Sequence, residues 1–132
     1  MKYMLLIYSA PDAGPQWGTP ERDLQMKRYF EFSNEVNEKG LFVAGDPLED
    51  TSAATTVRVR EGKRLTTDGP FAETKEQLGG ILVLEARDLN HAIQLMSAHP
   101  GVKFGPFEIR PAADLGEMVR DSEQRRGKTA VG

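Results

Sequence analysis

Hydrophobic and polar residues along the chain change their spacing several times, and each change marks a new element. In residues 2–8, Tyr3, Leu5 and Ile7 face one side of an extended chain and the residues between them face the other. Both faces are apolar, so both must be covered in the folded protein. Residues 78–86 repeat this two-sided pattern. The chain is therefore predicted to contain two buried strands, one near its start and one beyond its middle.

Two segments have the spacing of amphipathic helices. The first begins at Thr19 and Pro20, which suit the N-cap and the first helical position. It ends before Gly40, which suits the left-handed position after a helix. The second follows Asp88, a good N-cap, and ends at His99.

Shorter strands are predicted over residues 41–44 and 104–110. Residues 55–60 and 64–67 alternate in polarity around a short turn and form a hairpin. The order is thus strand, helix, strand, hairpin, strand, helix, strand. This is an α+β fold on the ferredoxin-like split βαβ plan, with an extra hairpin.

Two helices cover only one face of such a sheet. The other face keeps the outward apolar residues of both two-sided strands, and soluble monomers rarely expose a patch of that kind. We therefore expect a homodimer in which two sheets pack face to face around a two-fold axis.

Composition narrows the classes of function. The chain has 132 residues, which suits a single domain. The absence of cysteine excludes disulfides, thiolate metal sites and a cysteine nucleophile, and two histidines exclude a three-histidine metal site within one chain. A net charge of −3 gives no basis for nucleic acid as a partner. The first apolar run is too short for a signal peptide or a membrane span, so a cytoplasmic protein that binds no membrane is expected.

The end of the chain is polar. Leu115, Met118 and Val119 are spaced for one or two amphipathic helical turns, and residues beyond 120 are expected to be mobile. We predict a folded domain over residues 1–112 and a partly mobile polar tail over residues 113–132.

Four short stretches carry a family resemblance. Residues 67–80 read TDGPFAETKEQLGG, residues 45–48 read GDPL, residues 98–101 read AHPG, and residues 108–111 read EIRP. Together they resemble the DGPF subgroup of the YCII-related family, over residues 1–112. The resemblance implies a dimeric α/β barrel, a His–Asp pair in a cleft as an acid–base centre, and kinship with dehalogenating lyases. It also implies a link to extracytoplasmic-function sigma factors in some members.

His99 and Asp68 are the candidate catalytic residues. His99 ends a helix, where the negative end of the dipole would raise its pKa, and it would act as a general acid or base. The alternative is that His99 only caps the helix. Asp68 would orient the imidazole, or it would close a turn on its own backbone. No cofactor is expected.

The predicted ligand cleft surrounds the DGPF motif. Its glycines permit a close approach by a ligand, although a bulge in the strand explains the pair at 79–80 equally well. The arginine on the last strand would clamp a carboxylate or pair with an acid on the sheet surface. The predicted lining residues are Gly69, Pro70, Phe71, Gly79, Gly80 and Arg110.

Two classes of function stay open at this point. The first is cofactor-independent, lyase-like acid–base chemistry on a small molecule through His99 and Asp68. The second is a non-catalytic accessory or sensor module in a sigma-factor pathway. A closed cleft containing His99 would favour the first, and a flat charged surface would favour the second.

Overall fold

The computed structural model describes the backbone of residues 1–131 and the side chains of residues 1–127. Its elements follow the predicted order, with two short 3-10 helices added and a third α-helix at the end. They are β1 (Lys2–Ser9), α1 (Pro20–Glu38), β2 (Phe42–Pro47), η1 (Thr51–Ala53), β3 (Thr55–Arg60), β4 (Lys63–Asp68), β5 (Gln77–Glu85), α2 (Leu89–Ser97), η2 (Pro100–Lys103), β6 (Phe107–Pro111) and α3 (Leu115–Val131).

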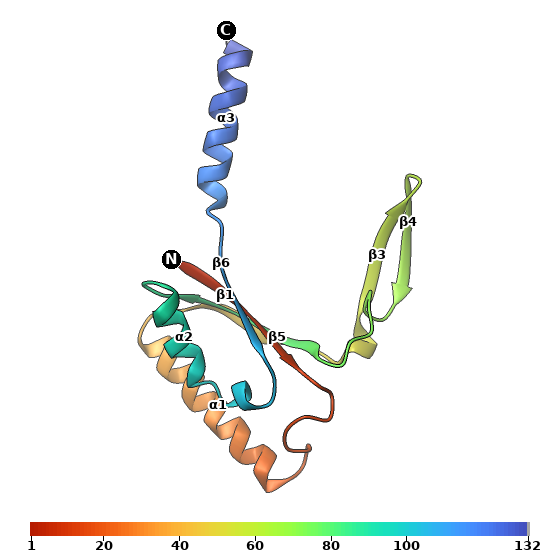
Figure 1. Ribbon diagram of the computed structural model, residues 1–132, viewed down its shortest axis with the longest axis vertical. Coiled ribbons are helices and arrows are strands. Elements are labelled where there is room, and N and C mark those ends of the chain that lie inside the picture. Colours follow the sequence, from red (N-terminus) through yellow and green to blue (C-terminus); the bar gives the residue numbers. More distant parts are fainter. Residues whose placement is uncertain (132) are drawn as a thin grey trace.

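Four strands form one antiparallel sheet in the order β2-β5-β1-β6. The two strands predicted to be buried, β1 and β5, are its two central strands. Helices α1 and α2 lie together on one side of this sheet (Figure 1). The order of strands and helices confirms the ferredoxin-like α+β fold.

The core lies between the sheet and these two helices. Leu5 of β1 and Leu84 of β5 are completely buried. Phe32 and Val36 of α1 and Met96 of α2 pack into the same cluster. Each helix begins at a predicted cap, because the side chains of the two N-cap residues accept backbone N–H groups of the first turn.

The face of the sheet away from the helices is also apolar. Met4 lies opposite Val83 and Leu6 lies opposite Ile81 in the register of β1 with β5. These four residues alternate with the core residues along their strands, so they point to the other face. We call them the open face. No element of the described chain packs on it as α1 and α2 pack on the core side, and the homodimer stays a prediction.

The hairpin forms a second sheet of two strands, β3 and β4. It stands away from the rest of the chain (Figure 1). Val57 and Val59 are 59% and 70% exposed, so the alternation seen in the sequence buries neither side of this hairpin within one chain.

The end of the chain is more regular than predicted. Instead of one or two turns, α3 is a single helix over Leu115–Val131 that projects from the body (Figure 1). Asp114 begins it by accepting the backbone N–H of Glu117. The mobility expected beyond residue 120 stays a prediction, and Gly132 lies outside the described residues. Among the described helices, none is long and apolar enough to cross a membrane.

A charge on the open face tests the homodimer. Leu6→Glu places a carboxylate at the centre of this face, and the expected result is a folded monomer. Leu82→Glu is the matched variant on the core side, where Leu82 is buried. It is expected to unfold the chain, because an unpaired charge is then buried. Sedimentation velocity gives the mass and circular dichroism gives the fold. A wild-type chain that stays monomeric at micromolar concentration would contradict the prediction.

Removing residues 124–132 tests the tail. The described side chains of α3, those up to residue 127, belong to neither hydrophobic cluster of the body, so the expected shift in thermal midpoint is under about 2 °C. Differential scanning calorimetry of the shortened and full-length chains measures it. A loss of many degrees would mean that the last turns of α3 dock on another surface.

Candidate functional site

His99 is held in place by the short segment that joins α2 to β6. Its backbone N–H donates to Met96 O at 3.0 Å, which ends α2. Its side chain then begins η2, because Nδ1 accepts the N–H of Gly101 at 2.9 Å. His99 is thus a cap, although not of the helix that the alternative interpretation named. It caps the start of the following 3-10 helix with its side chain and not the end of α2.

Three aromatic rings surround the imidazole of His99. Phe32 and Phe107 have ring centroids 5.0 Å away and Tyr29 has its centroid 5.4 Å away, all in edge-to-face geometry. The residue is only 7% exposed. Burial lowers the pKa of His99 from 6.5 to about 4. The increase in pKa predicted from the helix dipole is therefore wrong in sign, because desolvation outweighs the dipole here.

The hydrogen bond at Nδ1 fixes which nitrogen carries the proton. Since Nδ1 accepts from Gly101, the proton of the neutral ring lies on Nε2. Nε2 is buried and has no hydrogen-bond partner among the described residues. An unpaired buried donor costs about 1–3 kcal/mol, so an acceptor brought to Nε2 would be bound favourably.

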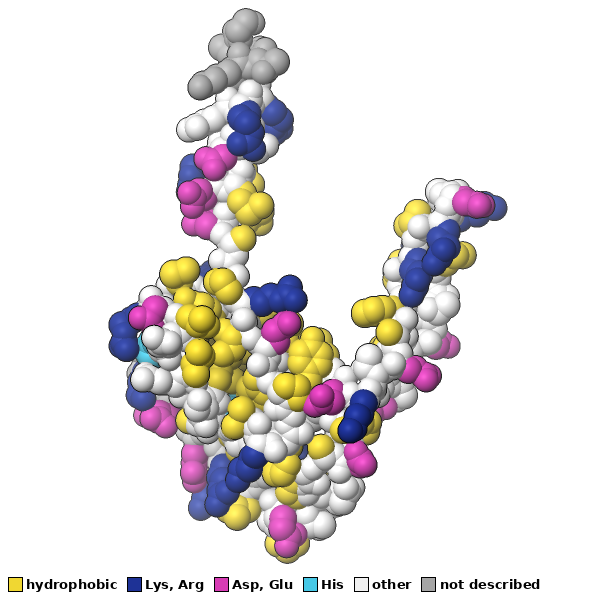
Figure 2. Space-filling model, in the orientation of Figure 1, with side chains coloured by type: hydrophobic (Ala, Val, Ile, Leu, Met, Phe, Trp, Pro, Cys, Tyr) yellow, Lys and Arg dark blue, Asp and Glu magenta, His cyan; other side chains and the backbone are white. Residues whose placement is uncertain are grey.

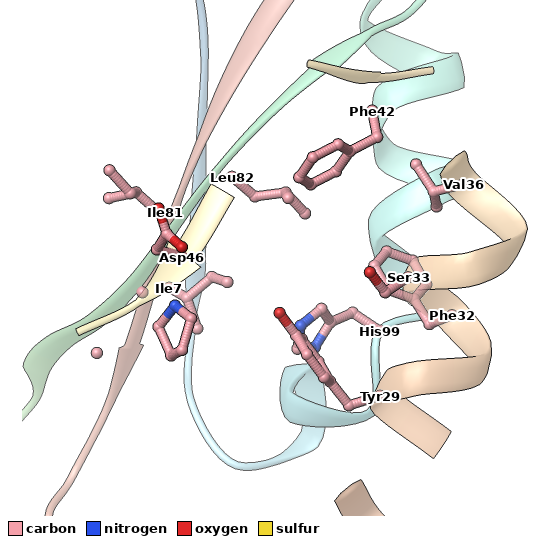
Figure 3. Close-up of a pocket in the computed structure, with 13 residues that line it drawn as sticks. Ile7, Tyr29, Phe32, Ser33, Val36, Phe42, Asp46, Ile81, Leu82 and His99 are labelled. Carbon is pink, nitrogen blue, oxygen red and sulfur yellow. The ribbon is translucent and has the colours of Figure 1, made fainter. Parts of the chain in front are cut away.

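A cavity of about 130 Å³ lies between α1 and the sheet, and His99 lines it (Figure 3). Most of its wall is apolar. Its polar groups are Tyr29 and Ser33 of α1, Asp46 of β2 and His99 itself. Asp46 is exposed, so its carboxylate lies at the rim of the cavity and not in the apolar interior. The full lining is Ile7, Tyr29, Phe32, Ser33, Val36, Phe42, Asp46, Pro47, Gly79, Gly80, Ile81, Leu82 and His99.

The predicted pair of His99 with Asp68 is not formed within the chain. Asp68 is the last residue of β4, opposite Thr55, and is exposed. The hairpin stands apart from the body that contains α2 and η2 (Figure 1). The backbone at Gly69 has a φ of +94° and donates its N–H to Ala54 O, which ties the motif to the base of the hairpin. The pairing of β4 with β3 decides the place of Asp68, and the turn that its side chain would close on its own backbone stays a prediction.

The predicted cleft residues are divided among different places. Gly79 and Gly80 line the His99 cavity. They also form a bulge in β5. Ile7 pairs with Gly80 and Tyr8 pairs with Leu78, so Gly79 has no partner residue on β1. The bulge is therefore present, and the contact of this pair with a ligand stays a prediction.

The other cleft residues lie outside the His99 cavity. Pro70 and Phe71 line a separate open groove of about 650 Å³ at the base of the hairpin. Arg110 lies on the sheet surface, where its Nε is 3.2 Å from Glu108 Oε2. It forms the surface ion pair that was the alternative to a ligand clamp.

Three polar residues of the cavity were missed by sequence reasoning. Asp46 belongs to the GDPL stretch that supported the family resemblance. That motif is the feature of the sequence from which Asp46 could have been identified as a candidate site residue. Tyr29 and Ser33 lie four residues apart, on one face of α1. Only their neighbours across the cavity distinguish them from other residues of an amphipathic helix. No group of three or more metal-ligating side chains occurs in the part of the chain that the structure describes.

Comparisons with known proteins agree on the family and the fold. Residues 1–115 match the YCII-related domain. An uncharacterized protein of Rhizobium meliloti (strain 1021) is 32% identical over 117 residues, which cover 86% of this chain and 93% of that protein. A solved structure of 5-chloro-2-hydroxyhydroquinone dehydrochlorinase from Burkholderia phenoliruptrix AC1100, in complex with 2,5-dihydroxybenzoquinone, is similar with a TM-score of 0.52. That match has 13% identity and covers 89% of this chain and 98% of the enzyme.

The low pKa of His99 predicts a specific dependence of stability on pH. The unfolded chain takes up a proton at His99 near pH 6.5, and the folded chain does so only near pH 4. The stability linked to the neutral ring is therefore fully present above pH 6.5 and is lost as the pH falls towards 4. The loss is on the order of 3 kcal/mol at most.

Urea unfolding between pH 4 and 8 measures this dependence. His99→Gln should remove the part of the pH slope that His99 causes, and His91→Gln should keep it. In an NMR titration Asp68→Asn should leave the pKa of His99 where it is. A His99 pKa above 6.5 in the wild type, lowered by Asp68→Asn, would contradict the structure and restore the His99–Asp68 pair.

Proposed function

Because the chain belongs to the YCII-related family, we propose that its cavity binds a small molecule and that His99 acts on that molecule as a hydrogen-bond donor. The observation that carries this proposal is the state of the imidazole. It is buried and neutral at pH 7, its Nδ1 is occupied by Gly101, and its Nε2–H has no partner among the described residues.

The size and lining of the cavity indicate the class of ligand. A cavity of about 150 Å³ is enough for benzene in a protein core. The cavity at His99 is similar, at about 130 Å³, and mostly apolar. A single unsaturated ring with one or more oxygen substituents therefore fits its volume, its wall and its one buried donor. The structural neighbour is named as acting on a hydroxyhydroquinone, a compound of this kind.

The same geometry favours one division of roles in acid–base chemistry. His99 is a poor base, because a proton on Nδ1 would break its bond with Gly101. As a donor, Nε2–H would stabilise negative charge that develops on a ring oxygen when a hydroxyl group loses its proton. Asp46 is the carboxylate on the cavity rim and replaces Asp68 as the proposed base, which takes that proton. On a chlorinated hydroquinone, the ring carbon that bears chlorine would take up one proton, both hydroxyl oxygens would lose theirs and form C=O bonds, and the C–Cl bond would break to release chloride. The net change is the loss of HCl to give a quinone, which is a lyase-like elimination.

A second candidate is a non-catalytic sensor module, for which a sigma-factor pathway is the setting implied by the family resemblance. One observation favours it: burial is the only cause of the shifted pKa of His99, and no carboxylate raises it. A site that binds a ring and has no charged partner next to the imidazole suits recognition without turnover. The two candidates use the same cavity and differ only in whether the ligand is consumed.

Binding of hydroquinone and chlorohydroquinone tests the proposal. His99→Phe keeps an aromatic ring but removes the donor, and it should weaken binding about 10-fold, the value of one to two hydrogen bonds. His91→Phe, outside the cavity, should have no effect. Isothermal titration calorimetry measures both. Equal affinity of the His99→Phe and wild-type chains would overturn the assignment of the cavity.

Asp46→Asn separates the two candidate functions. If the chain is an enzyme, this variant should bind chlorohydroquinone as the wild type does and should release chloride at least about 100-fold more slowly, because it lacks the base. Chloride release is followed with an ion-selective electrode. Binding without any chloride release by the wild type would favour the sensor module.

A further inference from the structure

Two hydroxyl groups on the helix side of the cavity have no partner within the described chain. Tyr29 and Ser33 of α1 both line the cavity, and neither side-chain oxygen makes a hydrogen bond to another described residue. We infer that these two hydroxyls bind a second oxygen of the ring ligand and make the cavity specific for rings with two oxygen substituents. The inference rests on the proposed function, in which His99 binds the first oxygen.

The conformation of Ser33 is the first observation behind this inference. A serine inside a helix can donate its hydroxyl to the carbonyl group four residues earlier. Ser97 of α2 does so, because its Oγ donates to Ile93 O at 2.7 Å. Ser33 makes no such bond to Tyr29 O, and its oxygen points towards the cavity (Figure 3). Its hydroxyl is therefore available to a ligand.

The packing of Tyr29 places a second hydroxyl at the same wall. Its ring packs edge-to-face on the imidazole of His99, with centroids 5.4 Å apart. Residues four apart lie on one face of a helix, so Tyr29 and Ser33 are neighbours along α1. Both side chains are half-buried, and both oxygens point into the space between α1 and the sheet (Figure 3). A ring held at His99 by one oxygen would present its other edge to these groups.

The two kinds of polar group suit different tasks. Nε2–H of His99 can only donate, whereas a hydroxyl can donate or accept. A ring hydroxyl needs an acceptor for its proton, and a ring carbonyl needs a donor. Tyr29 and Ser33 would therefore bind the second oxygen before and after it changes from C–OH to C=O in the proposed elimination. A site that binds a hydroxyl in this way discriminates against analogues that lack it.

The second substituent that fits this wall is uncharged. None of the described residues that line the cavity is a lysine or an arginine. In Figure 2 the Lys and Arg side chains lie mostly around the margin of the body and on the projecting elements, and hydrophobic side chains cover the middle of that face. A carboxylate in the cavity would have no cation beside it and would face Asp46 at the rim, which is unfavourable. A second hydroxyl or carbonyl oxygen avoids both penalties.

The affinities of hydroquinone and phenol, measured by isothermal titration calorimetry, test the inference. Phenol has one oxygen for His99, and hydroquinone has a second one for the wall of α1. The wild type should bind hydroquinone at least about sixfold more tightly, about threefold from one more hydrogen bond and about twofold from two equivalent oxygens. Tyr29→Phe with Ser33→Ala should bind phenol as the wild type does and should reduce the preference to about twofold. Ser33→Ala alone, the milder change, should reduce it in the same direction.

A matched control removes the same two groups outside the cavity. Tyr8→Phe with Ser97→Ala should keep the wild-type preference, since neither residue lines the cavity. 4-Hydroxybenzoate, which has a carboxylate in place of the second hydroxyl, should bind the wild type more weakly than phenol does.

The contrary results separate this inference from the proposed function. A wild type that binds both hydroquinone and phenol with a preference of only about twofold would overturn the role of Tyr29 and Ser33 and leave the cavity assignment standing. A full preference in the double variant would also overturn it, because the second oxygen would then be bound elsewhere, as at Asp46. Tighter binding of 4-hydroxybenzoate than of hydroquinone would overturn the uncharged substituent. If the wild type binds neither hydroquinone nor phenol, the proposed function fails and this inference fails with it.

Discussion

The structure depends on the fact that two helices cover only one face of a four-stranded sheet. That constraint places Leu5 and Leu84 in a closed core beneath α1 and α2. It also leaves Met4, Leu6, Ile81 and Val83 on the opposite side with no helix above them. Burying apolar surface is the main source of folding energy, so the two faces have different roles. One face stabilises the chain by itself, and the other has apolar surface left for another molecule.

The candidate site is a second consequence of the covered face. Phe32 of α1 and Phe107 of β6 meet His99 from different elements. Their packing excludes water from the imidazole and holds it neutral. The N–H of Gly101 then selects the tautomer. A Cβ at Gly101 would lie 3.1 Å from the His99 ring, so this close approach suits a glycine. The chemistry of His99 is therefore set by packing, and the sequence near it supplies only the cap.

The fold could be predicted from the sequence because its signals are local. The caps at Thr19 and Asp88 and the two-sided apolar strands each act within a few residues. The site could be predicted only in part. His99 could be identified as a candidate because the chain has only two histidines. Its pKa could not be predicted, because it depends on aromatic rings from α1 and β6, which are far away in the sequence. Asp68 failed as its partner because the hairpin pairs with itself and carries Asp68 away from the body. Asp46 reaches the cavity through the register of β2 with β5, which no local pattern encodes.

Strand β5 connects the two faces physically. Gly79 and Gly80 line the cavity at the bulge, and the next residue, Ile81, lies opposite Leu6 on the open face. The rest of the cavity wall comes from β1, β2, α1 and His99, and the hairpin and α3 project from the other side of the sheet (Figure 1). Ile81 belongs to both places, because it lines the cavity and is also one of the four residues of the open face. A molecule in the cavity and a partner on the open face would both contact β5 next to its bulge, where the extra residue lets the strand bend without breaking the core pairing of Leu5 with Leu82.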